Sequence, residues 1–282
     1  MHQAETCKTD IPQMLEIADV VQEGKAQKSF FFRHYIDCKP GQFIMVWLPG
    51  IDEKPMAVSY WKKSEFAFTS QSIGRFTGAL DSFKKGDKLG IRGPYGNSFS
   101  LKARHGERFS VDKRAKGELS HVTRASHATA CIVAGGVGLS SVSTLIDRLK
   151  NPLIIYGARS RENLIYLKRY KNMLITTDDG SFGRRGFATD VLKEVLPQNR
   201  KIKIVYTCGP EIMMKKIFEL CQKHKVELEA SLERYMACGF GICGKCMIND
   251  MICCIDGTIF NSKQLSQMSE FGDFARLKSG RK

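Results

Sequence analysis

The sequence lacks an uninterrupted apolar stretch long enough to span a membrane. Its longest apolar candidate, residues 128–146, is broken by Gly135, Gly136 and Gly138 and then by four serines and threonines, so it fits a glycine-rich loop better. The first residues also lack the basic-then-apolar pattern of a signal peptide. These absences predict a cytoplasmic protein that does not enter membranes.

Arrangements typical of hydrolases are missing too, since neither a Ser/His/Asp set nor a pair of carboxylates stands out. The chain is strongly basic, with a net charge of +15 from 44 basic and 29 acidic residues. Nucleic acid would suit that charge, but no nucleic-acid motif is present and aromatic residues do not interleave with the basic ones. We therefore favour a basic surface for anionic cofactors or an acidic partner protein, and expect no nucleic acid.

Cysteine, in contrast, is abundant, with ten in the chain. Because the cytoplasm keeps thiols reduced, this number argues against a disulfide framework. Half of the cysteines fall between Cys238 and Cys254, and such clustering predicts a metal site. The others are scattered and fit small buried side chains: Cys7, Cys38, Cys131, Cys208 and Cys221.

The spacing of the clustered cysteines indicates which metal group they bind. Cys238-x4-Cys243-x2-Cys246, followed by Cys253 and Cys254, has the plant-type [2Fe–2S] spacing. Glycines between these cysteines allow backbone N–H groups to approach the sulfurs. Zinc also accepts four thiolates, but structural zinc sites usually pair C-x2-C knuckles, so we favour the cluster. The spacing alone leaves the fourth ligand open between the last two cysteines.

The chain changes its pattern along its length, which predicts a multidomain protein. Residues 10–101 read as short strands separated by turns, typical of an antiparallel β-barrel. Residues 128–224 alternate strands and helices, which predicts an α/β doubly wound parallel sheet. A basic insertion or loop at 102–127 separates the two, and residues 225–282 form a small C-terminal domain around the cysteines.

Glycine-rich segments at predicted strand ends are candidate phosphate sites. Gly135-Gly136-Val137-Gly138 leads from a strand into a helix and would direct backbone N–H groups at a phosphate. Residues 208–210 end another strand at the same edge of the sheet. In the barrel, residues 73–78 precede a helical stretch and could hold a pyrophosphate. Each segment is a weak signal alone, because a tight turn would explain the glycine loop equally well and is the likelier account of residues 73–78.

Together these parts resemble the ferredoxin–NADP reductase superfamily, and most of all the electron-transfer subunits of class B, NAD-dependent dihydroorotate dehydrogenases. The likeness covers most of residues 10–265. Its most specific segments are Glu233-Arg-Tyr-Met-Ala-Cys-Gly239 and Cys254-Ile-Asp-Gly-Thr-Ile-Phe260. Further matching segments are 54–60, 74–77, 91–96, 134–139, 156–159, 177–180 and 208–210.

The resemblance implies three cofactors and assigns residues to each, with no catalytic side chain of its own. FAD would bind the barrel domain at Lys54, Pro55, Met56, Ala57, Phe76 and Thr77. NAD(H) would bind the α/β domain at Gly135, Gly136, Gly138, Cys208, Gly209 and Pro210. The [2Fe–2S] ligands would be Cys238, Cys243, Cys246 and Cys254, which leaves Cys253 spare.

The chain departs from the family's pattern at the flavin. The usual Arg-Pro-x-Ser reads Lys54-Pro-Met-Ala57 here, so a bidentate fork and a hydroxyl are lost. Either the affinity for flavin is lower, or Ser59 supplies the hydroxyl. In addition, only seven residues separate Cys246 from Cys254, and the 102–127 insertion has no counterpart in the pattern.

The function implied by the resemblance is electron transfer in pyrimidine biosynthesis. Electrons from dihydroorotate would leave the FMN of a separate catalytic subunit, pass through [2Fe–2S] to FAD, and reach NAD+ as a hydride. The two kinds of subunit would form a heterotetramer of two plus two. One alternative is a subunit of another NAD(P)H oxidoreductase, of the ferredoxin:NADP transhydrogenase or sulfhydrogenase type. The other is a zinc-binding regulatory module.

Overall fold

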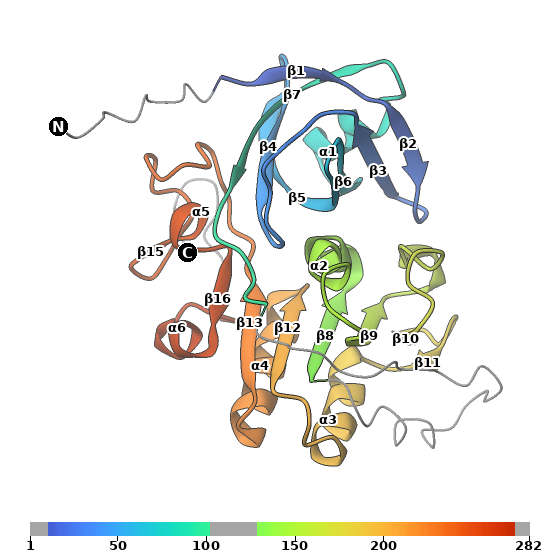
Figure 1. The fold of residues 1–282 in the computed structure, drawn as a ribbon, viewed down its shortest axis with the longest axis vertical. Helices are drawn as coiled ribbons and strands as arrows, with labels where there is room; N and C mark the ends of the chain where they lie inside the picture. Colours follow the sequence, from blue (N-terminus) through green and yellow to red (C-terminus); the bar gives the residue numbers. More distant parts are fainter. Residues whose placement is uncertain (1–10, 102–128, 274–282) are drawn as a thin grey trace.

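The computed structural model describes residues 11–101 and 129–273, so the predicted insertion at 102–127 lies outside the described residues. Figure 1 shows a β-rich unit above an α/β unit, with the C-terminal part of the chain lying along one side of both. Within the described ranges, no helix has the length and apolar character needed to cross a membrane.

The β-rich unit is an antiparallel sheet in the order β1-β7-β4-β5-β6-β3-β2. The two edge strands, β1 and β2, follow each other in the chain, and the residues between them bridge the two ends of the sheet. The Ile17 amide donates to Asp87 O, and the Ala18 amide donates to Phe31 O, both at 2.8 Å. This confirms the predicted antiparallel barrel. Its elements are β1 (Gln13–Glu16), β2 (Asp19–Gln22), β3 (Gln27–Phe32), β4 (Phe43–Leu48), β5 (Asp52–Lys62), β6 (Glu65–Gln71), α1 (Arg75–Asp81) and β7 (Lys88–Tyr95).

Aromatic side chains fill the barrel because alternate residues of β3 and β6 point inward. Phe30 stacks on Phe68 with ring centroids 5.3 Å apart, and Phe32 stacks on Phe66 at 5.1 Å. Helix α1 covers this core through Phe76 and other buried apolar side chains. The strand alternation that predicted the barrel therefore also determines its core.

The α/β unit is a seven-stranded sheet in the order β11-β10-β9-β8-β12-β13-β16. All pairs are parallel except that of β16 with β13, and the order reverses at β8, as in the predicted doubly wound fold. Its strands are β8 (Ala130–Gly135), β9 (Leu153–Ala158), β10 (Met173–Thr177), β11 (Arg184–Arg185), β12 (Ile204–Cys208), β13 (Glu227–Ser231) and β16 (Ile259–Asn261).

Helices cover both faces of this sheet. Helix α2 (Leu139–Ile146) follows the short 3-10 turn η2 (Gly136–Gly138) and lies between the sheet and the barrel (Figure 1). Helices α3 (Ala188–Gln198) and α4 (Glu211–His224) pack on the opposite face. Another 3-10 turn, η3 (Arg161–Asn163), follows β9. The residues at the carboxyl ends of β8, β9, β10 and β12 lie on the side of the sheet that faces the barrel.

The C-terminal region is not a detached lobe, because β13 and β16 are strands of the parallel sheet. Between them lie a hairpin of β14 (Met247–Ile248) and β15 (Met251–Ile252) and the short helix α5 (Cys253–Asp256). Helix α6 (Ser262–Gln267) follows. One apolar cluster joins this region to the sheet and to the barrel strand β4, so all three parts share a core.

Candidate functional site

The cysteine loop, residues 238–246, runs from the end of the parallel sheet to the hairpin. Three glycines in it have positive φ, Gly239 at +82°, Gly241 at +88° and Gly244 at +66°. Because L side chains rarely adopt this region, these glycines let the loop curl without strain. The curl turns successive backbone N–H groups inward, toward the sulfurs of the loop.

Cys238, one of the four predicted ligands, has surroundings that stabilise an anion. Burial opposes its ionisation, but backbone N–H groups of Cys243, Phe240 and Ile242 and the Cys243 thiol hydrogen-bond its sulfur and lower its pKa to about 6. The chain thus stabilises a thiolate at this position through its own backbone. A thiolate is the form that ligates a metal.

The predicted ligands lie in two pairs. Cys238 contacts Cys243. The Cys254 thiol hydrogen-bonds Cys246, and its sulfur accepts a hydrogen bond from the Gly241 amide. Burial, with the neighbouring Cys246, raises the pKa of Cys254 to about 12. In a [2Fe–2S] cluster each of the two irons takes a pair of protein ligands, so this pairing fits such a cluster. No group of three or more His, Cys, Asp or Glu side chains that could hold a single metal ion is found in residues 11–101 and 129–273.

Cys253 and Cys254 are the first two residues of helix α5, and their side chains have different surroundings. The Cys253 thiol is fully buried and lies 3.8 Å from the carbonyl oxygen of Leu232, to which it donates. Desolvation there raises the pKa of Cys253 far above its usual range. Cys254 instead faces Cys246, so the geometry favours Cys254 as the fourth ligand.

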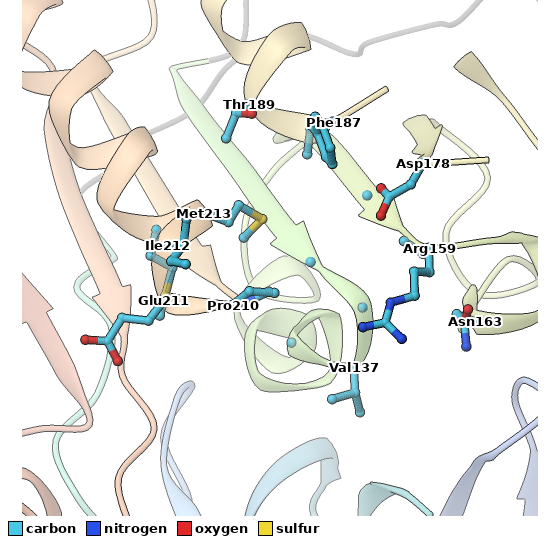
Figure 2. Close-up of a pocket in the computed structure, with 18 of the residues that line it drawn as sticks. Val137, Arg159, Asn163, Asp178, Phe187, Thr189, Pro210, Glu211, Ile212 and Met213 are labelled. Atoms are coloured by element: carbon cyan, nitrogen blue, oxygen red, sulfur yellow. The ribbon is translucent and has the colours of Figure 1, made fainter. Parts of the chain in front are cut away.

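The second feature is a cavity of about 740 Å³ at the carboxyl ends of the parallel strands. Figure 2 shows Pro210 and Met213 on one wall and Arg159 and Asp178 on the other. Gln71 and Ile73, just before helix α1, line it from the barrel. A cavity bounded by both units at the edge where the strand order reverses is where such folds bind nucleotides.

The predicted nucleotide residues line this cavity, with the exception of Cys208. The glycines are needed for close approach, since a Cβ on Gly138 would lie 2.6 Å from the Cys208 carbonyl oxygen and one on Gly209 would lie 2.9 Å from the Gly135 nitrogen. Cys208 itself is buried behind the wall, where burial, together with the charge of Glu233, raises its pKa to about 12. Its thiol therefore stays neutral.

Two charged residues that sequence reasoning did not assign to the site line the cavity, Arg159 directly after β9 and Asp178 directly after β10. Neither side chain has a hydrogen bond or ion pair with another described residue. The next residue, Asp179, differs, because its carboxylate accepts from the Ser181 hydroxyl at 2.6 Å. Their position at the carboxyl ends of predicted strands was the available signal.

Glu233 also lines this cavity. The residue as a whole is exposed, but neighbouring atoms crowd its carboxyl group. Desolvation of that carboxyl and the neighbouring charge of Glu211 raise its pKa. Glu211 is held in place by Arg234, whose guanidinium donates to both carboxylate oxygens, at 2.6 and 2.9 Å. The cavity thus contains a carboxyl that keeps its proton to a higher pH than usual.

The predicted flavin residues lie on the barrel side of the molecule. Lys54, in β5, forms an ion pair with Asp52 and lies 5.3 Å from the ring centroid of Tyr235, in the segment leading to the cysteines. Phe76 is buried in the barrel core, so its side chain is not open to a ligand. The Thr77 hydroxyl accepts from the Gly74 amide at 3.0 Å and caps the start of α1.

Ser59 does not lie with these residues. Its side chain is 1% exposed and bonds to the Ala67 carbonyl and the Thr69 hydroxyl. The register of β5 against β6 shifts between Val58 and Tyr60, and such a bulge turns Ser59 inward. The Ser59 hydroxyl therefore faces the barrel interior, which does not favour the alternative in which it serves the flavin.

Comparisons with known proteins address the same regions. The family described as the iron-sulfur cluster binding domain of dihydroorotate dehydrogenase B matches residues 233–266. A protein of Methanocaldococcus jannaschii is 38% identical over 96% of this chain and 98% of its own length. One of Pyrococcus horikoshii is 39% identical over 90% and 91%. Both carry the name "Probable dihydroorotate dehydrogenase B (NAD(+)), electron transfer subunit".

Solved structures show the fold class. An NADH-dependent reduced ferredoxin–NADP oxidoreductase matches with a TM-score of 0.74 over 92% of this chain and 93% of that one, at 23% identity. The ferredoxin reductase of carbazole 1,9a-dioxygenase matches with a TM-score of 0.60 over 78% and 67%, at 19% identity. The fold is thus that of ferredoxin-reductase-like proteins. Within this class, the chain belongs to the family of dihydroorotate dehydrogenase B electron transfer subunits.

Proposed function

We propose that this chain is the cytoplasmic NAD-reducing subunit of a dihydroorotate dehydrogenase, and that it carries electrons between a catalytic subunit and NAD+. The observation that carries the proposal is the pairing of four thiols, three in the cysteine loop and Cys254 in helix α5, beside a loop that packs on the barrel at Gly239. When bound, the [2Fe–2S] cluster supplies one-electron transfer, and FAD converts between single electrons and the hydride of NADH. All nine cysteines of the described residues are free thiols, which suits a reducing compartment.

Cys238, Cys243, Cys246 and Cys254 would hold the cluster. The backbone N–H groups around Cys238 and the Gly241 amide on Cys254 would stabilise its negative charge. Cys243 is the exposed ligand and Cys246 is buried. The cluster would therefore meet solvent, or a partner, on the Cys243 side.

FAD would lie along β5 at Lys54, Pro55, Met56 and Ala57. Lys54 offers a point charge in place of the family's usual arginine fork. The first turn of α1, with Phe76 and Thr77, would meet the pyrophosphate with backbone N–H groups. Since Ala57 lacks a hydroxyl and Ser59 faces inward, contacts to this part of the flavin would come from the backbone of β5.

NAD(H) would occupy the cavity at the sheet edge. The glycines of the β8–α2 loop, with Gly209 and Pro210, would meet the pyrophosphate with backbone N–H groups. Asp178 would accept from a ribose hydroxyl, as a carboxylate does in NAD-binding folds, and would repel the extra phosphate of NADP(H). Glu233, whose carboxyl has a raised pKa, would line the same nucleotide site.

The partner would be an FMN-containing catalytic subunit, in an assembly of two plus two. Around the exposed Cys243 lie solvent-exposed apolar side chains, Phe240, Ile242 and Ile255, with exposed fractions of 37%, 78% and 53%. Apolar side chains grouped on a surface mark a site of protein association. A catalytic subunit seated there would approach the cluster through its most accessible ligand.

The test is reconstitution under anaerobic conditions with the catalytic subunit from the same source. Dihydroorotate should reduce NAD+ only when both subunits are present, and the mixture should elute as one complex. Coupling to ferredoxin and NADPH without any response to dihydroorotate would instead indicate the transhydrogenase type. A colourless protein that retains zinc would indicate a regulatory module.

A further inference from the structure

Arg92, in β7, is a buried cation between the barrel and the cysteine loop. Its side chain is 7% exposed. Its Nε and Nη2 atoms donate to the two carboxylate oxygens of Glu53 in β5, at 2.7 and 2.6 Å. This bidentate fork fixes the plane of the guanidinium. Nothing in the assignments to cluster, flavin or nucleotide uses this pair.

Two aromatic rings flank the guanidinium. Its central carbon lies 5.6 Å from the ring centroid of Tyr95 and 5.4 Å from that of Phe240, and the two rings are 6.5 Å apart. Burial disfavours the charge on Arg92, but the hydrogen bonds to Glu53 and Tyr95 outweigh it and raise the pKa. The cation is therefore permanent, and a permanent cation attracts the faces of aromatic rings.

Phe240 links this cation to a predicted cluster ligand. The ring belongs to the cysteine loop, and the backbone N–H of the same residue donates to the Cys238 sulfur. Next to it, Gly239 packs on the barrel so closely that a Cβ there would lie 2.9 Å from Met45 Cγ. Met45 and Arg92 are register partners on β4 and β7, so both contacts fall on one face of the barrel.

We propose that Arg92 is a positioning residue that clamps the cysteine loop to the barrel by stacking on Phe240, and so holds the Phe240 amide on the Cys238 sulfur. Glu53 fixes the guanidinium through two hydrogen bonds, and Tyr95 contacts it with its hydroxyl and its ring. The clamp ties the cluster ligands to the sheet that carries the proposed flavin strand. This role rests on the proposed function for its meaning in electron transfer, but the clamp itself involves only side chains of this chain.

The strength of such a contact determines the size of the effect. A cation–π contact at a partly exposed ring shifts the balance between docked and open loop by about 2- to 30-fold. Releasing the loop also loosens an N–H donor from the Cys238 sulfur. Because such donors stabilise the added electron, their loss lowers the reduction potential of the cluster.

The experiment compares ring variants in the full-length, cofactor-loaded protein. Phe240→Leu should lower the hydrogen-exchange protection of amides 239–245 by about 2- to 30-fold, whereas Phe240→Tyr, which keeps a ring, should retain it. The matched control is Phe182→Leu, because Phe182 is equally exposed, at 37%, and lies 5.8 Å from Arg161 in a similar contact. That variant should leave the cysteine loop unchanged.

A second readout separates positioning from mere stability. The cluster's midpoint potential should fall in Phe240→Leu, fall less in Arg92→Lys, which keeps the charge but loses the fork, and stay at the wild-type value in Phe240→Tyr and Phe182→Leu. Equal protection and equal potential in Phe240→Leu and wild type would overturn the clamp. So would a loss in Phe182→Leu as large as that in Phe240→Leu.

The two proposals fail in distinguishable ways. If the wild-type protein holds no cluster, the proposed function fails, while loop protection still reports on the clamp. If the wild-type protein holds the cluster and Phe240→Leu matches it in both readouts, only the clamp fails.

Discussion

The cysteine loop and the sheet-edge cavity both gather backbone N–H groups, but they differ in where the remaining contacts come from. The four predicted ligands lie within seventeen residues of one another, and the start of helix α5 directs the adjacent thiols of Cys253 and Cys254 to different partners. In the cavity, the wall is assembled from the ends of separate strands, and Arg159 and Asp178 are brought together only by the topology. A site whose chemistry is local in sequence tolerates little change, whereas an assembled site can lose one contact and keep the rest.

The largest expected effect comes from removing a loop thiol. Cys243→Ser should abolish the cluster and the transfer of electrons from dihydroorotate to NAD+, because a cluster with three thiolates and one alcohol is poorly held. Flavin binding should survive, since the barrel is unaffected. Visible absorption and iron content measure the loss.

Cys253→Ser is the matched control for that variant. It should keep the cluster because its thiol faces Leu232, although burying a hydroxyl in place of a thiol lowers stability. Cys254→Ser should lose the cluster. The reverse spectra would overturn the ligand assignment.

The next effect concerns the surface around the exposed thiol. Ile242→Asp should weaken binding of the catalytic subunit by at least about tenfold, because a charge would be desolvated in an apolar contact. Ile11→Asp, at a similarly exposed isoleucine elsewhere, should bind as the wild type does. Titration calorimetry measures both, and equal affinities would place the interface elsewhere.

Backbone approach in the cavity predicts a smaller effect. Gly138→Ala should cost about 1–3 kcal/mol of stability, because its Cβ would lie 2.6 Å from the Cys208 carbonyl oxygen. Gly136→Ala, in the same loop, meets no atom within 4 Å, and with φ at +54° it should cost only about 1–2 kcal/mol. Urea unfolding compares them. A larger loss at Gly136 would contradict the packing described here.

Coenzyme choice provides the smallest effect. Asp178→Asn should raise the affinity for NADPH relative to NADH by about tenfold, since it removes a negative charge that would face the extra phosphate in the proposed site. Asp179→Asn is the control, because that carboxylate is bound to Ser181. Fluorescence titration with both nucleotides measures the ratio. An unchanged ratio in Asp178→Asn would place the ribose away from β10.

These contrasts explain what the sequence could predict. Three of the predicted ligands, the barrel and the doubly wound sheet follow from spacing and alternation, which are local properties, whereas spacing left the fourth ligand open and only the resemblance favoured Cys254 over Cys253. Strand alternation places Ser59 on the face of Ala57, whereas the bulge between Val58 and Tyr60, which turns it inward, is visible only in the strand pairing. Arg92 and Phe240 lie far apart in sequence, so no pattern could have indicated their contact.

The central claim is that the four cysteines hold a [2Fe–2S] cluster connected to a nicotinamide site in one chain. The most direct measurement is electron paramagnetic resonance of the purified full-length protein, before and after anaerobic addition of NADH, with iron, sulfide and flavin analysis. The account predicts two irons and two sulfides per chain, bound FAD, and a reduced [2Fe–2S] signal that appears on addition of NADH. A protein with one zinc, no sulfide and no signal after NADH would contradict it.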